Sequence, residues 1–270
     1  MKRFPIWSWL WMLIGAFYFL MPLYATLDFS LRMQRGTLSF LAYRKIFDDP
    51  QFLETFGFSN WMAALTILAT LLLVVPTAYW VHLRLPSWRP AVEFVTLMPF
   101  VIPAIVLVFG MITTYSRPLT LFSVEIMPGL TNTTLGTNML LLAGYVVLSL
   151  PYMYRAVDTG LRAMDVRTLT EAAQSLGAGW PRILWSVIFP NLRVALLSGA
   201  LLTFAIVVGE LTLANFLDRP AFGPYLWLLG QHRTYEPSAL SIISFALTWA
   251  AMVLLQFFTR GTQGQVAGAR

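Results

Sequence analysis

One ionisable residue, Glu210, lies inside a long apolar stretch of this 270-residue chain, within the sequence VVGELTLANF. A carboxylate at that depth in a membrane is costly, which makes it a candidate for a functional role. Glu210 could face a path along which a solute passes and attract a cation. Alternatively, it is protonated or hydrogen-bonded to a neighbouring helix and only holds the structure together. The residue type and its position leave both roles open.

No pattern typical of a catalytic site accompanies this acid. The chain has no cysteine, and its two histidines, His82 and His232, form no metal-binding motif. The motifs H-E-x-x-H and G-x-S-x-G are absent, which argues against a membrane-embedded enzyme. The phosphate-binding motif G-x-x-x-x-G-K-[ST] is also absent, so ATP chemistry would have to come from another polypeptide. We therefore expect no catalytic residues, no metal and no cofactor.

The most distinctive pattern lies between two apolar stretches and reads RTLTEAAQSLGAGWPRILWSVIFPNLR (residues 167–193). Thr168 and Glu171 have the spacing of a capping box, which predicts a helix that starts at Thr168. Gly177 and Gly179 are predicted to stop this helix, because glycine tolerates the left-handed conformation that is common after a helix C-terminus.

A second short helix is predicted after the glycines. Pro181 suits its first turn, and Pro190 is predicted to end it just before the fifth apolar stretch. Its apolar residues fall on one face and are Ile183, Leu184, Val187 and Ile188. Two short helices that meet at a glycine elbow often only connect longer helices, and the physical pattern alone favours that interpretation.

The segment resembles the EAA loop of ABC importer permeases. That family's pattern is Glu-Ala-Ala, three variable residues, a glycine, and an apolar stretch that ends in proline. The matching residues are Glu171, Ala172, Ala173, Gly177 and Pro190. Val187 and Phe189 stand where isoleucine and leucine are usual, and both keep the apolar character. The resemblance to the family covers the six-span plan, which is nearly the whole chain. Within the family, the chain looks most like permeases of the spermidine/putrescine importers and their relatives.

The resemblance implies that this loop docks on an ATP-hydrolysing subunit and couples ATP binding to movement of the permease. It implies two such ATP-binding subunits, a second permease that is a different chain rather than another copy, and an extracytoplasmic solute-binding protein. A polyamine is the expected solute, with 2-aminoethylphosphonate or another small polar solute as the alternative, and no nucleic-acid partner is expected. A stand-alone secondary transporter or channel is the alternative function, although the apolar stretches show no paired charged relay.

The elements that position these residues have to be membrane-spanning helices. Hydrophobic residues make up 58% of the chain and charged residues only 11%, whereas soluble domains are about 25% charged. A bilayer core about 30 Å thick requires about 20 apolar residues per helix. Six segments satisfy this requirement and predict an all-α membrane bundle: 6–27, 60–81, 91–115, 138–156, 194–217 and 239–258. The whole chain, residues 1–270, is expected to form one permease domain that contains the loop 157–193, and residues 116–137 are expected to form a polar loop.

The charge distribution predicts that both termini lie in the cytoplasm. In that orientation, 11 of the 18 lysine and arginine residues lie on the cytoplasmic side, and the seven outside are matched by seven acidic residues. Together with these spans, the resemblance to ABC importer permeases implies a multi-pass protein of the bacterial cytoplasmic (inner) membrane, in contact with lipid.

Polar residues within the predicted spans could line a path for the solute. Thr113 and Asn215 join Glu210 as candidates for this translocation path, although hydroxyl and amide groups also bond across helices to hold a bundle together. Pro99 and Pro103 lie four residues apart in the third span and share a face. They predict a fixed kink, with a hinge as the alternative.

Overall fold

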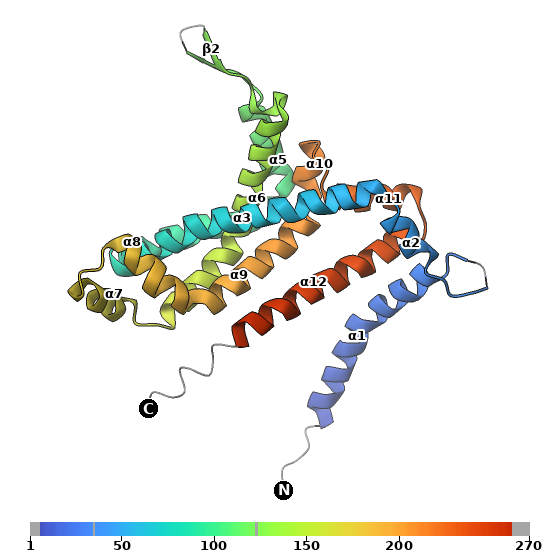
Figure 1. Cartoon of the computed structure of the whole chain (residues 1–270), viewed down its shortest axis with the longest axis horizontal. Coiled ribbons are helices and arrows are strands. Elements are labelled where there is room, and N and C mark those ends of the chain that lie inside the picture. The colour runs from blue at the N-terminus through green and yellow to red at the C-terminus, as the bar shows by residue number, and fades with distance from the viewer. Residues whose placement is uncertain (1–5, 35, 122–123, 261–270) are drawn as a thin grey trace. The chain divides into compact units, whose positions relative to one another are not determined.

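Helices account for nearly all of the structure. The computed structural model describes residues 6–34, 36–121 and 124–260, and within them it shows a series of helices and one β-hairpin (Figure 1). The chain divides into two compact units. The first contains the residues up to 54 together with 225–251, and the second consists mainly of residues 55–224.

The first unit combines the N-terminal helices with elements from the other end of the chain. It contains α1 (Ile6–Leu31), α2 (Leu41–Phe47), the start of α3 (Pro50–Leu83), most of α11 (Phe222–His232) and the first part of α12 (Glu236–Arg260). The hydroxyl groups of Ser30 and Tyr43 lie 2.7 Å apart and connect α1 to α2. The Tyr225 hydroxyl donates to the Asp49 carboxylate at 3.0 Å. This second bond connects α11 to the residues that precede α3.

The second unit is built on α3, α6 (Thr134–Arg162) and α9 (Phe189–Gly209) (Figure 1). Buried apolar side chains form two clusters within it, one containing Met153 and Ile188 and the other containing Leu141 and Leu213. These clusters bury the apolar faces of the long helices and so fix how they pack.

Glycines allow α6 and α9 to approach closely. A Cβ atom placed on Gly160 would lie 2.7 Å from the Ala195 Cβ, and one placed on Gly199 would lie 2.7 Å from the Met153 Sδ. Neither distance leaves room for a side chain without movement of the neighbour. Small residues at the contact between two helices are typical of helix packing in membranes.

Helices that are long and apolar enough to cross a membrane confirm the predicted class of fold. They are Trp9–Leu31, Pro50–Leu83, Thr134–Arg162 and Trp180–Gly209, and one bent pair of helices can provide a fifth crossing. All six segments predicted from the sequence are largely helical, and the last of them lies within α12. The described residues therefore support four or five crossings by length and composition, and the exact count of six stays a prediction.

The third predicted span, 91–115, is broken rather than kinked. It contains most of α4 (Arg89–Leu97), a 3-10 turn over Met98–Phe100, and α5 (Ala104–Tyr115), and the two halves are bent by 98°. Pro103 lies at the break in an extended conformation, with φ −58° and ψ 139°. Because proline has no N–H and disfavours a helical residue before it, the helix cannot continue through this point.

A β-hairpin occupies part of the segment predicted as a polar loop at 116–137. Strand β1 (Leu119–Leu121) pairs antiparallel with β2 (Val124–Met127), and the register shifts between Leu119 and Thr120. The loop prediction relied on the Thr- and Asn-rich residues that follow the hairpin. It overlooked the alternation of apolar and polar residues before them.

Candidate functional site

The segment that resembles the EAA loop starts with a helix capped by an aspartate. This helix, α7 (Val166–Ser175), begins two residues before the predicted start at Thr168. The Asp165 carboxylate accepts the Thr168 hydroxyl at 2.7 Å and the Thr168 N–H at 3.1 Å, and these bonds lower the pKa of Asp165. Glu171 accepts a bond from Arg167 Nε at 2.8 Å instead of closing a capping box. The predicted helix exists, but its predicted cap was wrong.

A glycine elbow ends α7, as predicted. Gly177 has φ +80°, a left-handed conformation that favours glycine. Its N–H donates to the Gln174 carbonyl at 2.8 Å, and the Ala178 N–H donates to the Ala173 carbonyl at 3.0 Å. This pair of bonds is a Schellman motif. The turn leaves the Leu176 side chain 89% exposed, so the elbow presents an apolar group at its tip.

The helix after the elbow runs into a membrane span without a break. Helix α8 (Trp180–Ile183) has Pro181 in its first turn, as predicted. Pro190 does not end the helix, contrary to the prediction. A π-helical turn over Leu184–Ile188 leads directly into α9, and Pro190 occupies the first turn of that helix. The wider π turn changes the backbone bonding where proline provides no N–H.

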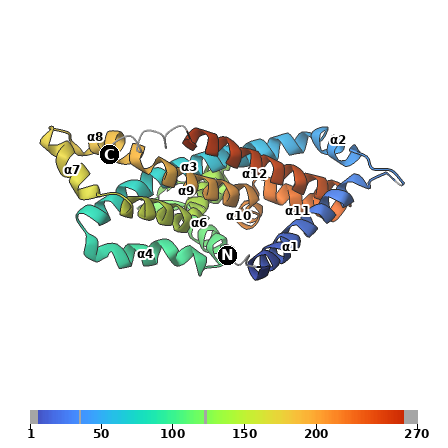
Figure 2. The same ribbon diagram turned by 90° about the horizontal axis from the view of Figure 1, so that it is seen from below.

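Two side-chain contacts attach the elbow to α3. The hydroxyl oxygens of Tyr79 and Thr170 lie 3.0 Å apart, and both residues are buried. The rings of Trp80 and Trp180 stack with centroids 5.8 Å apart and an interplanar angle of 25°. The apolar face predicted after the elbow is also buried, through Ile183, Leu184 and Ile188. Figure 2 shows α7 and α8 together at one end of α3, α6 and α9.

The residues predicted to couple the chain to an ATPase occupy different surroundings. Glu171, Ala172 and Gly177 are exposed along one side of α7 and its elbow. Ala173 is partly buried against the apolar cluster of the second unit. Pro190 lies apart from them, exposed on α9. The accessible part of the set is therefore the outer side of α7 and its elbow.

Glu210 lies where the fifth predicted span, 194–217, is interrupted between α9 and α10 (Thr212–Phe216). Its carboxylate oxygens accept the N–H of Leu213 at 2.9 and 3.0 Å and the N–H of Ala214 at 3.2 Å. The residue is only 9% exposed. The carboxylate thus satisfies backbone donors that the start of a helix leaves unpaired. Of the two roles that the sequence left open for Glu210, this geometry favours holding the structure together over contact with a solute.

No bond in the described part of the chain joins Glu210 to the two other path candidates. The Thr113 hydroxyl donates to the Phe109 carbonyl at 2.8 Å, within α5 itself. Asn215 is exposed on α10, which packs against α5 through the rings of Phe109 and Phe216 with centroids 5.0 Å apart. A role for these residues in a solute path therefore stays a prediction.

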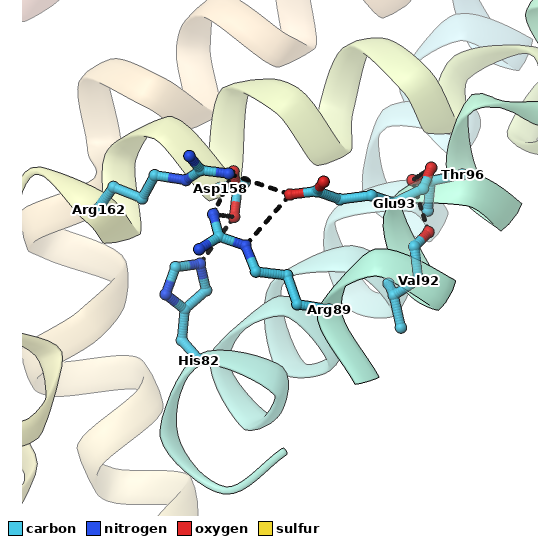
Figure 3. Close-up of polar contacts among 7 residues, drawn as sticks. All are labelled: His82, Arg89, Val92, Glu93, Thr96, Asp158 and Arg162. Atoms are coloured by element: carbon cyan, nitrogen blue, oxygen red, sulfur yellow. Dashed lines mark hydrogen bonds and ion pairs between the residues drawn. The ribbon is translucent and has the colours of Figure 1, made fainter. Parts of the chain in front are cut away.

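A charged cluster that the sequence analysis missed joins α3, α4 and α6 (Figure 3). Asp158 is at its centre, with His82 Nε2 at 2.7 Å, Arg89 Nη2 at 2.9 Å and Arg162 Nη2 at 2.7 Å. Glu93 lies 3.1 Å from Arg89 Nε and 3.0 Å from Arg162 Nη2. The Asp158 side chain is 9% exposed, and a buried carboxylate is tolerated only with such partners.

The sequence does contain a partial signal for this cluster. Arg89 and Glu93 are four residues apart, as are Asp158 and Arg162, and this spacing places opposite charges side by side on a helix. The sequence-based prediction uses the arginines only as charges that set the orientation in the membrane. The predicted end of the fourth span at residue 156 also placed Asp158 outside the helix in which it lies.

These features define a multi-pass helical membrane protein in which a helix–elbow–helix segment connects two spans. The chain belongs to the family of binding-protein-dependent transport system inner membrane components, whose family model matches residues 75–263. This membership confirms the resemblance to ABC importer permeases. It identifies a transport protein of the inner membrane rather than an enzyme.

The curated relatives include permeases of polyamine importers. The chain is 33% identical to the spermidine/putrescine transport system permease protein PotC of Haemophilus influenzae over 124 residues, which are 44% of this chain and 48% of PotC. It is 25% identical to PotB of the same organism over 221 residues, which are 78% of this chain and 75% of PotB. The chain thus spans about half the length of the first relative. Other matching permeases are named for methionine, sulfate and molybdenum, so the relatives do not agree on one solute.

A solved structure shares the fold. The chain is similar to a bacterial ABC transporter involved in the import of the acidic polysaccharide alginate, with a TM-score of 0.71 and 13% sequence identity. The similarity covers 96% of both chains. At this identity the likeness concerns the fold alone.

Proposed function

We propose that this chain is the permease subunit of an ATP-driven importer and that the outer side of α7 and its elbow docks on an ATP-hydrolysing subunit. The observation that carries the proposal is the elbow at the residues of the EAA pattern. Glu171 and Leu176 are exposed there beside Gly177, on a helix whose other face is bonded to α3. Membership of the family of binding-protein-dependent transport components supports the same function.

Coupling requires a stiff connection between the docking surface and the membrane spans. The Tyr79–Thr170 hydrogen bond and the stacking of Trp80 on Trp180 hold α7 and α8 against α3. Helix α8 continues into α9 without a break. A force applied to α7 would therefore reach two spans at once.

The proposed assembly contains two ATP-binding subunits, a second permease that is a different chain, and an extracytoplasmic solute-binding protein. The missing phosphate-binding motif is the reason to place ATP hydrolysis on other subunits. The mixed permease pair is supported by the relatives PotC and PotB, which are two permease proteins named for the same kind of transport system in one organism.

We place the elbow and both termini on the cytoplasmic side of the bacterial inner membrane. Arg167, Arg182 and Arg193 lie in or beside the elbow segment, and positive charge is enriched in cytoplasmic loops. Residues 1–5 and 261–270 lie outside the described residues, so the orientation rests on the charges of the loops.

The proposed cargo is a small polar solute. A polyamine is the candidate suggested by the names of PotC and PotB, and 2-aminoethylphosphonate is the alternative with contrasting charge. Glu210 no longer favours the cation, because its carboxylate accepts backbone hydrogen bonds at the start of α10.

Co-purification from detergent-solubilised membranes tests the importer. We expect the tagged chain to bring down an ATPase and a different permease, with a native mass that fits one copy of each permease and two ATPase copies. Two copies of this chain without another permease would reject the mixed pair. Solute uptake by the purified chain alone in liposomes would instead favour a secondary transporter or channel.

A further inference from the structure

A groove of about 800 Å³ runs along α6 and α9 in the second unit. Its polar side chains are Tyr152, Arg155 and Thr159 on α6, and Asn191 and Ser198 on α9. The rest of its lining consists of apolar or small residues. The groove is therefore a wide, mostly apolar surface with a few polar groups along two helices that the proposed coupling segment connects.

Arg155 is the sole charged residue among the side chains that line this groove in the described part of the chain. Its side chain is exposed, and no ion pair or hydrogen bond holds its guanidinium within that part of the chain. Arg162 and Arg89, by contrast, are bound to acidic side chains. A free guanidinium offers five N–H donors in a planar fork that matches a carboxylate or a phosphonate.

The acidic side chains of the spans in this unit are already bonded. Asp158 has three basic partners and Glu93 has two, all within the cluster of Figure 3. Glu210 accepts backbone N–H groups at the start of α10. None of these three residues lines the groove. Arg155 and Thr159 also line an adjacent pocket with Glu93 and Asp158, but both of these carboxylates are held in ion pairs. A cationic solute in the groove would therefore meet the charge of Arg155 without a free carboxylate to offset it.

We propose that the α6–α9 groove is part of the solute path and that it takes a solute with an acidic group, whose oxygens bind Arg155. The hydroxyl groups of Tyr152, Thr159 and Ser198 are the additional polar contacts that the groove offers. This inference rests on the proposed importer function and deepens it, because it selects an acid-bearing solute such as 2-aminoethylphosphonate over a polyamine.

The charge preference of the groove can be measured without transport. Because the chain contains no cysteine, Ser198→Cys gives it a single thiol in the groove. In membranes that contain the complete complex, the thiol reacts with a negatively charged (2-sulfonatoethyl) and a positively charged (2-trimethylammonioethyl) methanethiosulfonate reagent. The modification of this chain is followed by mass spectrometry. The ratio of the two rates is normalised to that of a free thiol in solution.

Arg155→Gln in the Ser198→Cys background should lower the anion-to-cation rate ratio about three- to tenfold, and high salt should reduce the effect. Arg155→Lys should keep most of the preference. Arg84→Gln is the matched control, because Arg84 is exposed just after α3 and does not line the groove. The proposal is wrong if Arg155→Gln leaves the anion-to-cation rate ratio unchanged, or if Arg84→Gln lowers it by the same factor. Neither result would contradict the importer function.

Uptake by the reconstituted importer tests the solute class directly. The KM for 2-aminoethylphosphonate should rise tenfold or more in Arg155→Gln, whereas Arg84→Gln should leave it within about twofold of the wild-type value. Arg155→Lys should restore much of the loss. If the wild-type importer and the Arg155→Gln variant take up spermidine equally well, the proposal of an acid-bearing solute is wrong, but the importer function still holds.

Discussion

The hydroxyl oxygens of Tyr79 and Thr170 lie 3.0 Å apart, although the two residues are 91 positions apart in the chain. The Thr170 hydroxyl also donates to the Val166 carbonyl at 2.7 Å, so Tyr79 is the donor in the bond between the two side chains. Both residues are buried. The bond is a direct polar connection between α7 and α3, and its direction has consequences for mutation.

Thr170→Val is expected to destabilise the protein more than Tyr79→Phe. The valine leaves the Tyr79 hydroxyl buried without an acceptor, which costs about 1–3 kcal/mol, whereas the phenylalanine leaves Thr170 bonded to Val166 and costs about 1 kcal/mol. Thermal unfolding of the purified complex measures both losses. The double variant should lose less than the two single losses together, and equal, additive losses would contradict the assigned direction.

Gly177 is expected to reject most side chains because of its backbone conformation. No atom lies within 4 Å of a Cβ placed on it, so space within this chain is not the obstacle. At φ +80°, a residue such as valine costs about 1–2 kcal/mol. Gly177→Val should therefore reduce ATPase co-purification and solute uptake while membrane insertion stays normal, as shown by the amount of chain in washed membranes.

Docking can be separated from this backbone effect. Asparagine and aspartate both tolerate the left-handed conformation and have nearly the same shape. Gly177→Asp should reduce assembly with the ATPase or transport, and Gly177→Asn should do so less. Normal transport by the valine and aspartate variants alike would remove Gly177 from the coupling surface.

The elbow could be predicted from the sequence because its signals are local. Gly177 requires only its own backbone conformation, and Pro181 requires only a place in the first turn of a helix. The apolar segments were predictable for a similar reason, since length and composition alone select membrane helices. The prediction that Pro190 ends a helix was wrong, because proline is tolerated in a membrane helix when the local backbone rearranges, here through a π turn.

The remaining features depend on contacts between distant residues. Asp158 and His82 are 76 positions apart, and their contact follows from how α3 and α6 pack. The capping role of Glu210 depends on the break after Gly209, which an apolar sequence does not reveal. Arg162 lies four residues after Asp158 and is paired with it, whereas no such spacing reveals that Arg155 lies in a groove.

Asp158→Ala is expected to be strongly destabilising. Removing the carboxylate leaves His82, Arg89 and Arg162 without their shared partner, and breaking such a buried ion cluster costs about 3–5 kcal/mol. The matched control is Glu171→Ala, which breaks an ion pair whose side chains are 81% and 61% exposed and should cost at most about 1 kcal/mol. Comparable losses of thermal stability in both variants would argue against a structural role for the cluster.

The start of α7 is expected to loosen in acid. Hydrogen bonds from Thr168 lower the pKa of Asp165, so the charged carboxylate is favoured in the folded state. This stabilisation is complete above the ordinary aspartate pKa of about 3.9 and is lost as the pH falls through the lower folded-state value. The Thr168 amide should therefore exchange faster than the intrinsic pH dependence of amide exchange predicts only below about pH 4. Asp165→Ala should show the faster exchange at every pH, and an unchanged amide in that variant would contradict the cap.

Glu210→Gln and Glu210→Ala should separate the two roles that the sequence left open for this residue. Glutamine keeps one side-chain oxygen that can accept the Leu213 N–H, so Glu210→Gln should fold and transport normally with an unchanged pH dependence of uptake. Glu210→Ala leaves the buried N–H groups of Leu213 and Ala214 without their side-chain acceptor, which should cost about 1–3 kcal/mol of stability. Uptake in proteoliposomes between pH 5 and 8, together with thermal unfolding, measures both effects. If Glu210→Gln changes the pH dependence of uptake while the protein stays fully stable, the carboxylate acts on the solute and its capping bonds are secondary.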